Sequence, residues 1–98
     1  MASPAIFQKF YTSVMHIQNL QPGLVEERSY VTVMADRNGR LVLKVLDMDG
    51  RIAKTMVAQI NEGRQQLELN MGDLDSGRYV MNAFSGDIFI KSMRFEKQ

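Results

Sequence analysis

The residues of this sequence that could do chemistry are one short acidic motif, one histidine, and scattered serines and carboxylates. Asp47-Met48-Asp49-Gly50 has the start of a calcium loop. A complete loop reads Asp-x-Asp-x-Asp-Gly and ends with a bidentate Glu six residues after the glycine, where this chain has Met56. We therefore interpret the motif as a hairpin turn. His16 is the single histidine and there is no cysteine, so the sequence predicts no metal site.

The sequence also lacks a complete set of residues for nucleophilic or acid/base catalysis. A nucleophilic serine needs a sharp strand-to-helix turn, and the serines of this chain fall in predicted strands and turns. The carboxylates available for an acid/base pair fall in predicted loops, where we expect them to be solvated. The residues considered are Ser29, Ser76, Ser85, Ser92, Glu26, Glu27, Asp73 and Asp75. We expect no enzymatic activity and no cofactor.

Charge and hydropathy narrow the classes of partner. The formal net charge is +1, which gives no field of one sign such as a dedicated nucleic-acid binder has. Lys91, Arg94 and Lys97 alternate with aromatic residues, but Glu96 lies among them, and we expect a solvated strand face and no nucleic-acid partner. No stretch approaches the roughly 20 apolar residues that span a bilayer, so we expect no membrane insertion.

The N-terminus has neither the early positive charge nor the unbroken apolar stretch of a secretory signal. The localisation expected therefore depends on whether Met1 is the native start. We expect the cytoplasm if Met1 is the native start, and the cell surface or exterior if the chain is a domain excised from a secreted cargo protein.

The elements that position these residues are organised around the turn at residues 74–77. Gly77 accepts the backbone conformation of a sharp turn, and Leu74 can fill the core beside it. Tyr79 then begins a strand. This arrangement predicts a tyrosine corner, in which the ring packs inside and the hydroxyl bonds backbone a few residues upstream. The competing interpretation is an exposed Tyr79 that stacks on a ligand.

From residue 14 onward the hydrophobic pattern has a period of two, interrupted by turn residues at short intervals. We expect strands at residues 14–18, 28–35, 40–47, 51–60, 65–70, 78–85 and 88–95. Asn38-Gly39 is the strongest short hairpin signal, because both residues tolerate the positive φ of a type I′ turn, so it predicts antiparallel pairing of the second and third strands.

The predicted fold is all-β, a seven-stranded antiparallel Ig-like or fibronectin-like β-sandwich, with a barrel as the lesser alternative. Ninety-eight residues make one domain. We expect an N-terminal arm or short helix over residues 1–13, where apolar residues recur at helical spacing, and the sandwich over residues 14–98. The methionines at strand positions, Met34, Met56, Met71, Met81 and Met93, are expected to fill the core; the alternative is an adaptable binding surface.

Together these features resemble a known family. The turn at residues 47–51 after a Val/Leu strand is followed by Gly63, by Leu67 and Leu69 in a strand, by Leu74, Gly77 and Tyr79, and by a closing strand with basic residues at its end. In order and spacing, residues 19–98 resemble the C-terminal sorting domain of the type IX (Por) secretion system.

The resemblance implies an Ig-like domain whose last strands are read by an outer-membrane translocon. The recognition residues it implies are Gly77, Tyr79, Lys91, Arg94, Phe95 and Lys97, and the partner is a protein of the secretion machinery. The alternative is a stand-alone β-sandwich that binds peptide, protein or carbohydrate as a cytoplasmic adaptor. The sequence does not define the oligomeric state.

Overall fold

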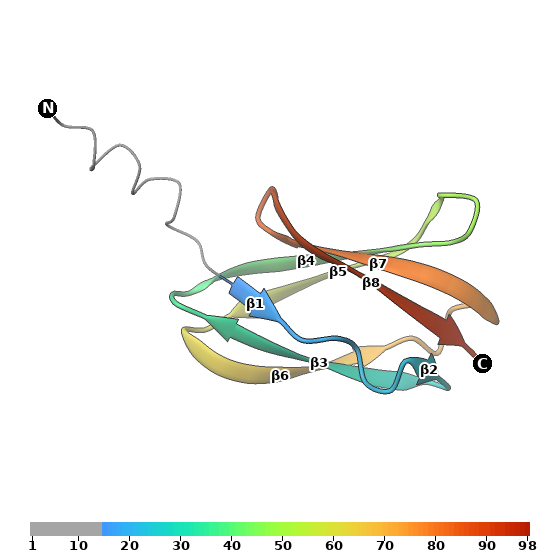
Figure 1. Cartoon of the computed structure of the whole chain (residues 1–98), viewed down its shortest axis with the longest axis horizontal. Coiled ribbons are helices and arrows are strands. Elements are labelled where there is room, and N and C mark those ends of the chain that lie inside the picture. Colours follow the sequence, from blue (N-terminus) through green and yellow to red (C-terminus); the bar gives the residue numbers. More distant parts are fainter. Residues whose placement is uncertain (1–14) are drawn as a thin grey trace, which may run out of the picture.

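The computed structural model describes residues 15–98, so the predicted N-terminal arm at 1–13 lies outside the described residues. Within them the chain is all-β, with eight strands and no helix (Figure 1). The strands are β1 (Met15–Ile17), β2 (Leu24–Val25), β3 (Arg28–Ala35), β4 (Gly39–Leu46), β5 (Ile52–Ile60), β6 (Gly63–Asn70), β7 (Gly77–Ser85) and β8 (Ile88–Lys97).

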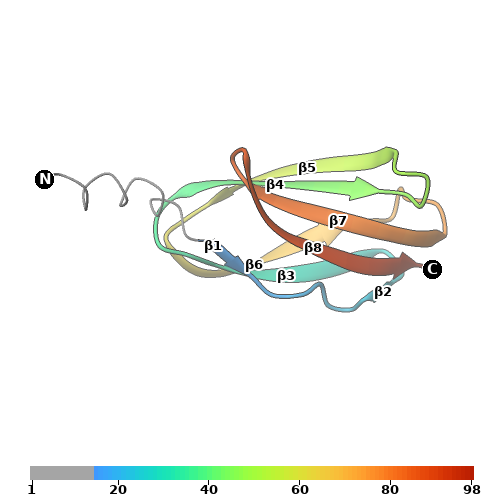
Figure 2. The ribbon, with the colours of Figure 1, turned by 45° about the horizontal axis from the view of Figure 1, so that its top comes forward.

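The strands form two sheets that lie one over the other (Figures 1 and 2). One sheet has three strands in the order β1-β3-β6, and the other has five in the order β2-β8-β7-β4-β5. In Figure 1, β8 runs from the upper layer down toward β2 beside the lower layer. The five-stranded sheet is therefore curled, and at its β2 end it reaches the side of the three-stranded sheet.

Alternation of apolar and polar residues fixes which side of each strand faces the core. In β4, Leu41, Leu43 and Val45 are buried, while the residues between them are not. The same holds in β7, where Tyr79, Met81 and Ala83 point inward. The inward residues of both sheets form a single core cluster. Of the methionines expected in the core, Met71, Met81 and Met93 are buried, Met56 is half-buried, and Met34 is exposed.

The prediction of a hairpin at Asn38-Gly39 is wrong. β3 pairs with β1 and β6, whereas β4 pairs with β5 and β7, so residues 36–38 carry the chain from one sheet to the other. Neither Asn38 nor Gly39 has a positive φ. Gly39 already lies in β4 opposite Ile60, and the Asn38 side chain accepts a hydrogen bond from the backbone of Glu62 at 2.8 Å. Asn38 therefore links the two segments that carry the chain between the sheets here, residues 36–38 and 61–62.

The expectation of seven strands, all antiparallel, also needs correction. The structure has β2 as an additional strand, and β2 runs parallel to β8, with Leu24 opposite Glu96 and Val25 opposite Lys97. Backbone bonds from Glu96 to Gly23 and from Gln98 to Val25, at 2.9 and 2.8 Å, hold this pairing. Two residues are too few to show a period, which is why the pattern of the sequence did not reveal β2.

Two other turns are hairpins shaped by glycine, and the first of them is the one expected from the acidic motif. β4 and β5 are antiparallel neighbours joined through residues 47–51, where Gly50 has a φ of 83°. β7 and β8 are antiparallel neighbours joined at Gly86, which has a φ of 60°. Both glycines occupy backbone conformations that other residues rarely adopt, so these turns follow directly from glycine placement.

Candidate functional site

Tyr79 forms the tyrosine corner that the sequence predicts. Its side chain is 7% exposed, and its hydroxyl donates a hydrogen bond to the backbone carbonyl of Asp75 at 2.6 Å. Its ring stacks on that of Phe95, the opposite residue in β8, with centroids 5.4 Å apart and an angle of 18°. Burial raises the pKa of Tyr79, and the carboxylates of Asp75 and Asp47 add to the effect. The ring therefore belongs to the core and is not a free stacking surface.

The structure does not expose the six expected recognition residues equally. Tyr79, Phe95 and Lys97 are buried, and the Lys97 ammonium bonds the carbonyl of Gln98 at 3.1 Å. Lys91 is half-buried and donates to the backbone carbonyl of Ile17 at 3.2 Å, which links β8 to β1.

Gly77, with a φ of 152°, shapes the turn. Among the six, Arg94 has an exposed side chain. Gly77, Tyr79, Phe95 and Lys97 thus shape one end of the sandwich, and Lys91 joins β8 to β1.

Three of the six lie together around one depression of about 350 Å³ at the ends of β7 and β8. Tyr79, Arg94 and Phe95 line it, together with Arg78 and Glu96, which lie in the same turn and strand, and with Met48 and Val80, which sequence reasoning missed. Met48 comes from the β4–β5 turn and is 70% exposed. We call this feature the arginine depression.

Arg78 and Arg94 are diagonal neighbours across β7 and β8, since Arg78 lies opposite Glu96 and Arg94 opposite Val80. Diagonal residues are about 7–8 Å apart at Cα, within reach of long side chains. In the described part of the chain neither arginine forms an ion pair, whereas Arg28 on the other sheet binds Glu68 at 3.2 Å. Two unpaired guanidinium groups at one depression are a suitable place for a carboxylate.

The arginine depression belongs to a larger surface, the outer face of the five-stranded sheet. It consists of the outward residues of four strands: Arg40, Val42, Lys44, Leu46, Ile52, Thr55, Val57, Gln59, Arg78, Val80, Asn82, Phe84, Phe89, Ser92, Arg94 and Glu96. An apolar row crosses β5, β4, β7 and β8 through paired positions, from Val57 and Val42 to Phe84 and Phe89. Val57 and Phe89 are 60% and 54% exposed.

The aromatic rings of this face are already engaged. Phe84 and Phe89 meet edge to face, with centroids 5.8 Å apart and an angle of 72°. The Lys44 ammonium lies 5.2 Å from the centre of the Phe84 ring. Apolar pairs extend to a second row, where Leu46 lies opposite Ile52 and Val80. The face therefore combines two apolar rows with polar and charged residues, and Lys44 lies between the two rows.

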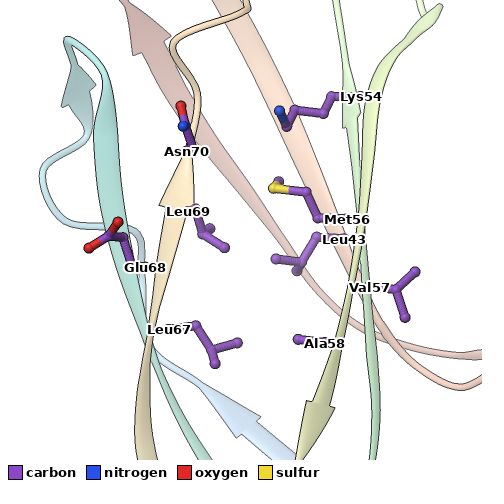
Figure 3. Close-up of a pocket in the computed structure, with 9 residues that line it drawn as sticks. All are labelled: Leu43, Lys54, Met56, Val57, Ala58, Leu67, Glu68, Leu69 and Asn70. Carbon is purple, nitrogen blue, oxygen red and sulfur yellow. The ribbon is translucent and has the colours of Figure 1, made fainter.

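A second hollow lies at the open edge between the two sheets, where the edge strands β5 and β6 face each other (Figure 3). It holds about 280 Å³. Met56 and Ala58 of β5 point toward Leu67 and Leu69 of β6, while Val57 and Glu68 point away (Figure 3). At one end Lys54 points inward and binds Asp73 at 2.8 Å. An inward-pointing charge on an edge strand opposes addition of a further strand, so this side is guarded.

The acidic motif at residues 47–51 is a turn, as expected. One carboxylate oxygen of Asp47 accepts the backbone N–H groups of Asp49 and Arg51 at 2.9 and 3.0 Å. Over residues 15–98 no group of three or more metal-ligating side chains comes together. His16 is exposed on β1. No helix in the described residues is long and apolar enough to cross a membrane.

No protein-family model matches the sequence, and no curated protein matches it. Several solved structures are similar in fold. A β-glucosidase from Kluyveromyces marxianus is 8% identical with a TM-score of 0.55, over 89% of this chain and 15% of that one. The alkylpurine DNA glycosylase AlkC from Pseudomonas fluorescens, bound to DNA containing an abasic site analog, is 18% identical with a TM-score of 0.53, over 86% and 30%.

A GH3 β-glucosidase from Bifidobacterium adolescentis is 10% identical with a TM-score of 0.50, over 88% of this chain and 17% of that one. The chain therefore spans less than a third of each of these proteins. At such low identity the likeness shows the fold alone, and the chemistry of the larger proteins does not transfer to this chain.

Proposed function

We propose that this chain is a non-enzymatic protein-interaction module, built as an Ig-like sandwich and recognised through its last two strands. The observation that carries the proposal is the pair of unpaired arginines, Arg78 and Arg94, beside the exposed Met48 on the outer surface of β7 and β8. Exposed charge and apolar area on a rigid sheet are suited to binding a partner surface.

Two features support the Ig-like assignment. The chain passes from one sheet to the other after β3 and again after β5, as in sandwiches with Greek-key connections. The tyrosine corner of Tyr79 and Asp75 is a recurring feature of that class. On this assignment β2 is a short addition that closes one side of the five-stranded sheet against β8.

The sorting role follows from the resemblance to type IX C-terminal sorting domains. In this proposal Gly77, Tyr79, Phe95 and Lys97 act indirectly, by giving the end of the sandwich its shape, and Arg94 is read directly. The alternative is a stand-alone adaptor that uses the same surface for a partner in the cytoplasm. Both are interaction modules, and they differ in whether an export machinery is the partner.

The test is a fusion of the whole chain behind an export signal and a reporter, expressed in cells with a working type IX system. The informative variant carries Arg78→Gln and Arg94→Gln together. Its matched control is Arg64→Gln, since Arg64 is exposed on β6 in the other sheet. A truncation is unsuitable, because β8 contributes buried residues to the core.

We expect the intact fusion and the Arg64 variant to reach the cell surface, and the double variant to stay in the periplasm. If the intact fusion also stays in the periplasm, the sorting role is wrong and the adaptor role replaces it. If all three reach the surface, export does not depend on the two arginines.

A further inference from the structure

We propose that the outer face of the five-stranded sheet binds an extended protein segment that carries a carboxylate and, four residues along, an apolar side chain. The carboxylate lies between Arg78 and Arg94, and the apolar side chain lies on Phe84 and Phe89. This inference rests on the proposed function as an interaction module, and it adds the chemistry of the partner.

Charge is the first argument. On the outer face there are four cations, Arg40, Lys44, Arg78 and Arg94, and one carboxylate, Glu96. The whole chain has a net charge of only +1, so positive charge is concentrated on this face. In the adjoining turn the Asp47 carboxylate is directed into its own backbone bonds, and Asp49 is a second, exposed carboxylate, so the face and this turn together still have more cations than anions. A segment with a negative charge is therefore complementary to the face.

The arginine depression defines where that charge goes. A planar guanidinium binds a carboxylate with two parallel hydrogen bonds, and two such groups offer donors from both strands of the β7–β8 pair. Met48 and Val80 line the same depression, so the carbon chain of a Glu or Asp meets apolar contacts there. Glu96 lines the depression too, opposite Arg78, and offsets part of the repulsion between the two cations.

The apolar row defines the second contact and the spacing. Val80 and Phe84 point outward from the same strand, four residues apart, which is about 13 Å in extended backbone. An extended segment laid along β7 repeats this spacing, with its inward residues at positions i, i+2 and i+4. The middle residue then lies over Asn82 and Ser92, which are polar.

The chemistry of the face favours a protein over a nucleic acid. Base stacking needs free aromatic faces. Here the Lys44 ammonium lies 5.2 Å from the centre of the Phe84 ring and Phe89 meets Phe84 edge to face, so these two rings form no parallel platform for successive bases. The exposed Phe89 can still contact an aliphatic side chain. The remaining apolar residues are aliphatic: Val42, Leu46, Ile52, Val57 and Val80. Aliphatic area beside arginines is suited to an acidic and apolar peptide.

The experiment uses the full chain with ¹³C-methyl methionine and ¹⁵N amide labels. The probe is a capped seven-residue peptide, Thr-Glu-Thr-Ser-Thr-Leu-Thr, whose Glu, Ser and Leu share one side of a strand. Three control peptides replace Glu with Gln, Glu with Lys, or Leu with Ser. We expect the Glu peptide to shift the NMR signals of the Met48 methyl and of the Arg78 and Arg94 amides. The Gln peptide should bind about tenfold more weakly, and the Lys peptide should not bind.

The matched protein variants are Arg78→Gln with Arg94→Gln, and Arg64→Gln as the control on the other sheet. The double variant should lose the preference for Glu over Gln, while the control keeps it, and added salt should weaken the Glu peptide alone. Equal binding of the Glu and Gln peptides, or no binding of either, overturns the inference.

A short single-stranded oligonucleotide that shifts the same signals more strongly than the Glu peptide also overturns it, and assigns the face to nucleic acid. The export test and the peptide test can fail independently of each other. A fusion exported equally with and without the two arginines keeps the sorting role and removes the arginines from it, and the peptide titration then decides this inference by itself. Selective Glu binding by a chain that is never exported keeps the inference and removes the sorting role.

Discussion

The Tyr79 hydroxyl donates a 2.6 Å hydrogen bond to the carbonyl oxygen of Asp75, four residues upstream, from a side chain that is 7% exposed. The bond fixes the turn at residues 74–77 to the start of β7. Phe95 stacks on the ring and positions β8 beside it. Because Arg78 is next to Tyr79 and Arg94 is next to Phe95, this buried pair also sets the spacing of the two exposed arginines.

We predict that Tyr79→Phe lowers the free energy of unfolding by about 0.5–1.5 kcal/mol, since the half-buried hydrogen bond to the Asp75 carbonyl is lost. Tyr79→Ala should lower it by about 3–5 kcal/mol, because a cavity also opens beside Phe95. The measurement is urea denaturation followed by circular dichroism. Tyr30→Phe is the control, since Tyr30 is at the exposed margin on β3, and it should change little. Equal small effects at both tyrosines would contradict the buried arrangement.

The raised pKa of Tyr79 predicts how stability changes at alkaline pH. Below the ordinary tyrosine pKa of about 10, the phenol is neutral in both states and its full contribution is present. Above pH 10 the unfolded chain loses this proton before the folded chain does, so stability falls as pH rises. Denaturation at a series of pH values should show a steeper alkaline fall in the native chain than in Tyr79→Phe. Parallel curves would mean that the phenol titrates normally.

A matched pair of glycines tests the corrected path of the chain. Gly63 has a φ of 107°, so Gly63→Ala should cost about 1–3 kcal/mol through backbone strain, although the site has open space. Gly39 lies in β4 without a positive φ, and an added Cβ would meet the Met15 methyl at an ordinary 3.5 Å. Gly39→Ala should therefore be neutral or slightly stabilising. If denaturation midpoints show the larger loss at Gly39, the type I′ hairpin was the correct interpretation.

The contrast between these glycines shows what the sequence could and could not predict. Period-two alternation predicts seven of the eight strands, because burial of one side is a local property of each strand. Pairing between strands is not local. Asn38 and Gly39 fit a tight hairpin, yet the core is filled only when β3 and β4 lie in different sheets. Tertiary packing of Leu41 and Leu43 against the other sheet outweighs the turn preference.

The candidate site was predictable only where it depends on a local pattern of residues. Leu74, Gly77 and Tyr79 form a local pattern, and the structure confirms the corner that the pattern predicts. The outer face was not predictable, because β7 carries apolar residues on both sides, with Met81 buried and Val80 and Phe84 facing outward. Only the register with β4 and β8 shows that Phe84, Val42 and Phe89 form one row.

The ion pair between Lys54 and Asp73, at the β5–β6 side, can be tested by titrating Asp73. The two carboxylate oxygens of Asp73 accept the Lys54 ammonium at 2.8 and 2.9 Å, and this hydrogen bonding lowers the pKa of Asp73 below its ordinary value. Lys54→Met should raise the Asp73 pKa toward that value. A carboxyl ¹³C titration by NMR measures it, with Lys44→Met as the control on the outer face. An unchanged pKa in Lys54→Met would show that the pair does not persist in solution.

The last prediction concerns the end of the chain. Deleting residues 91–98 should abolish cooperative unfolding, because Met93 and Phe95 are buried and β2 pairs with no other strand among residues 15–98 than β8. Loss of that pairing exposes Val25, which is fully buried. The truncated chain should therefore lose the sharp urea transition and bind a hydrophobic dye such as ANS. Glu96→Gln, at an exposed position of the same strand, should keep both properties of the native chain. A truncated chain that still unfolds cooperatively would mean that β8 is an addition to a stable sandwich, and the last strands could then act as a detachable signal.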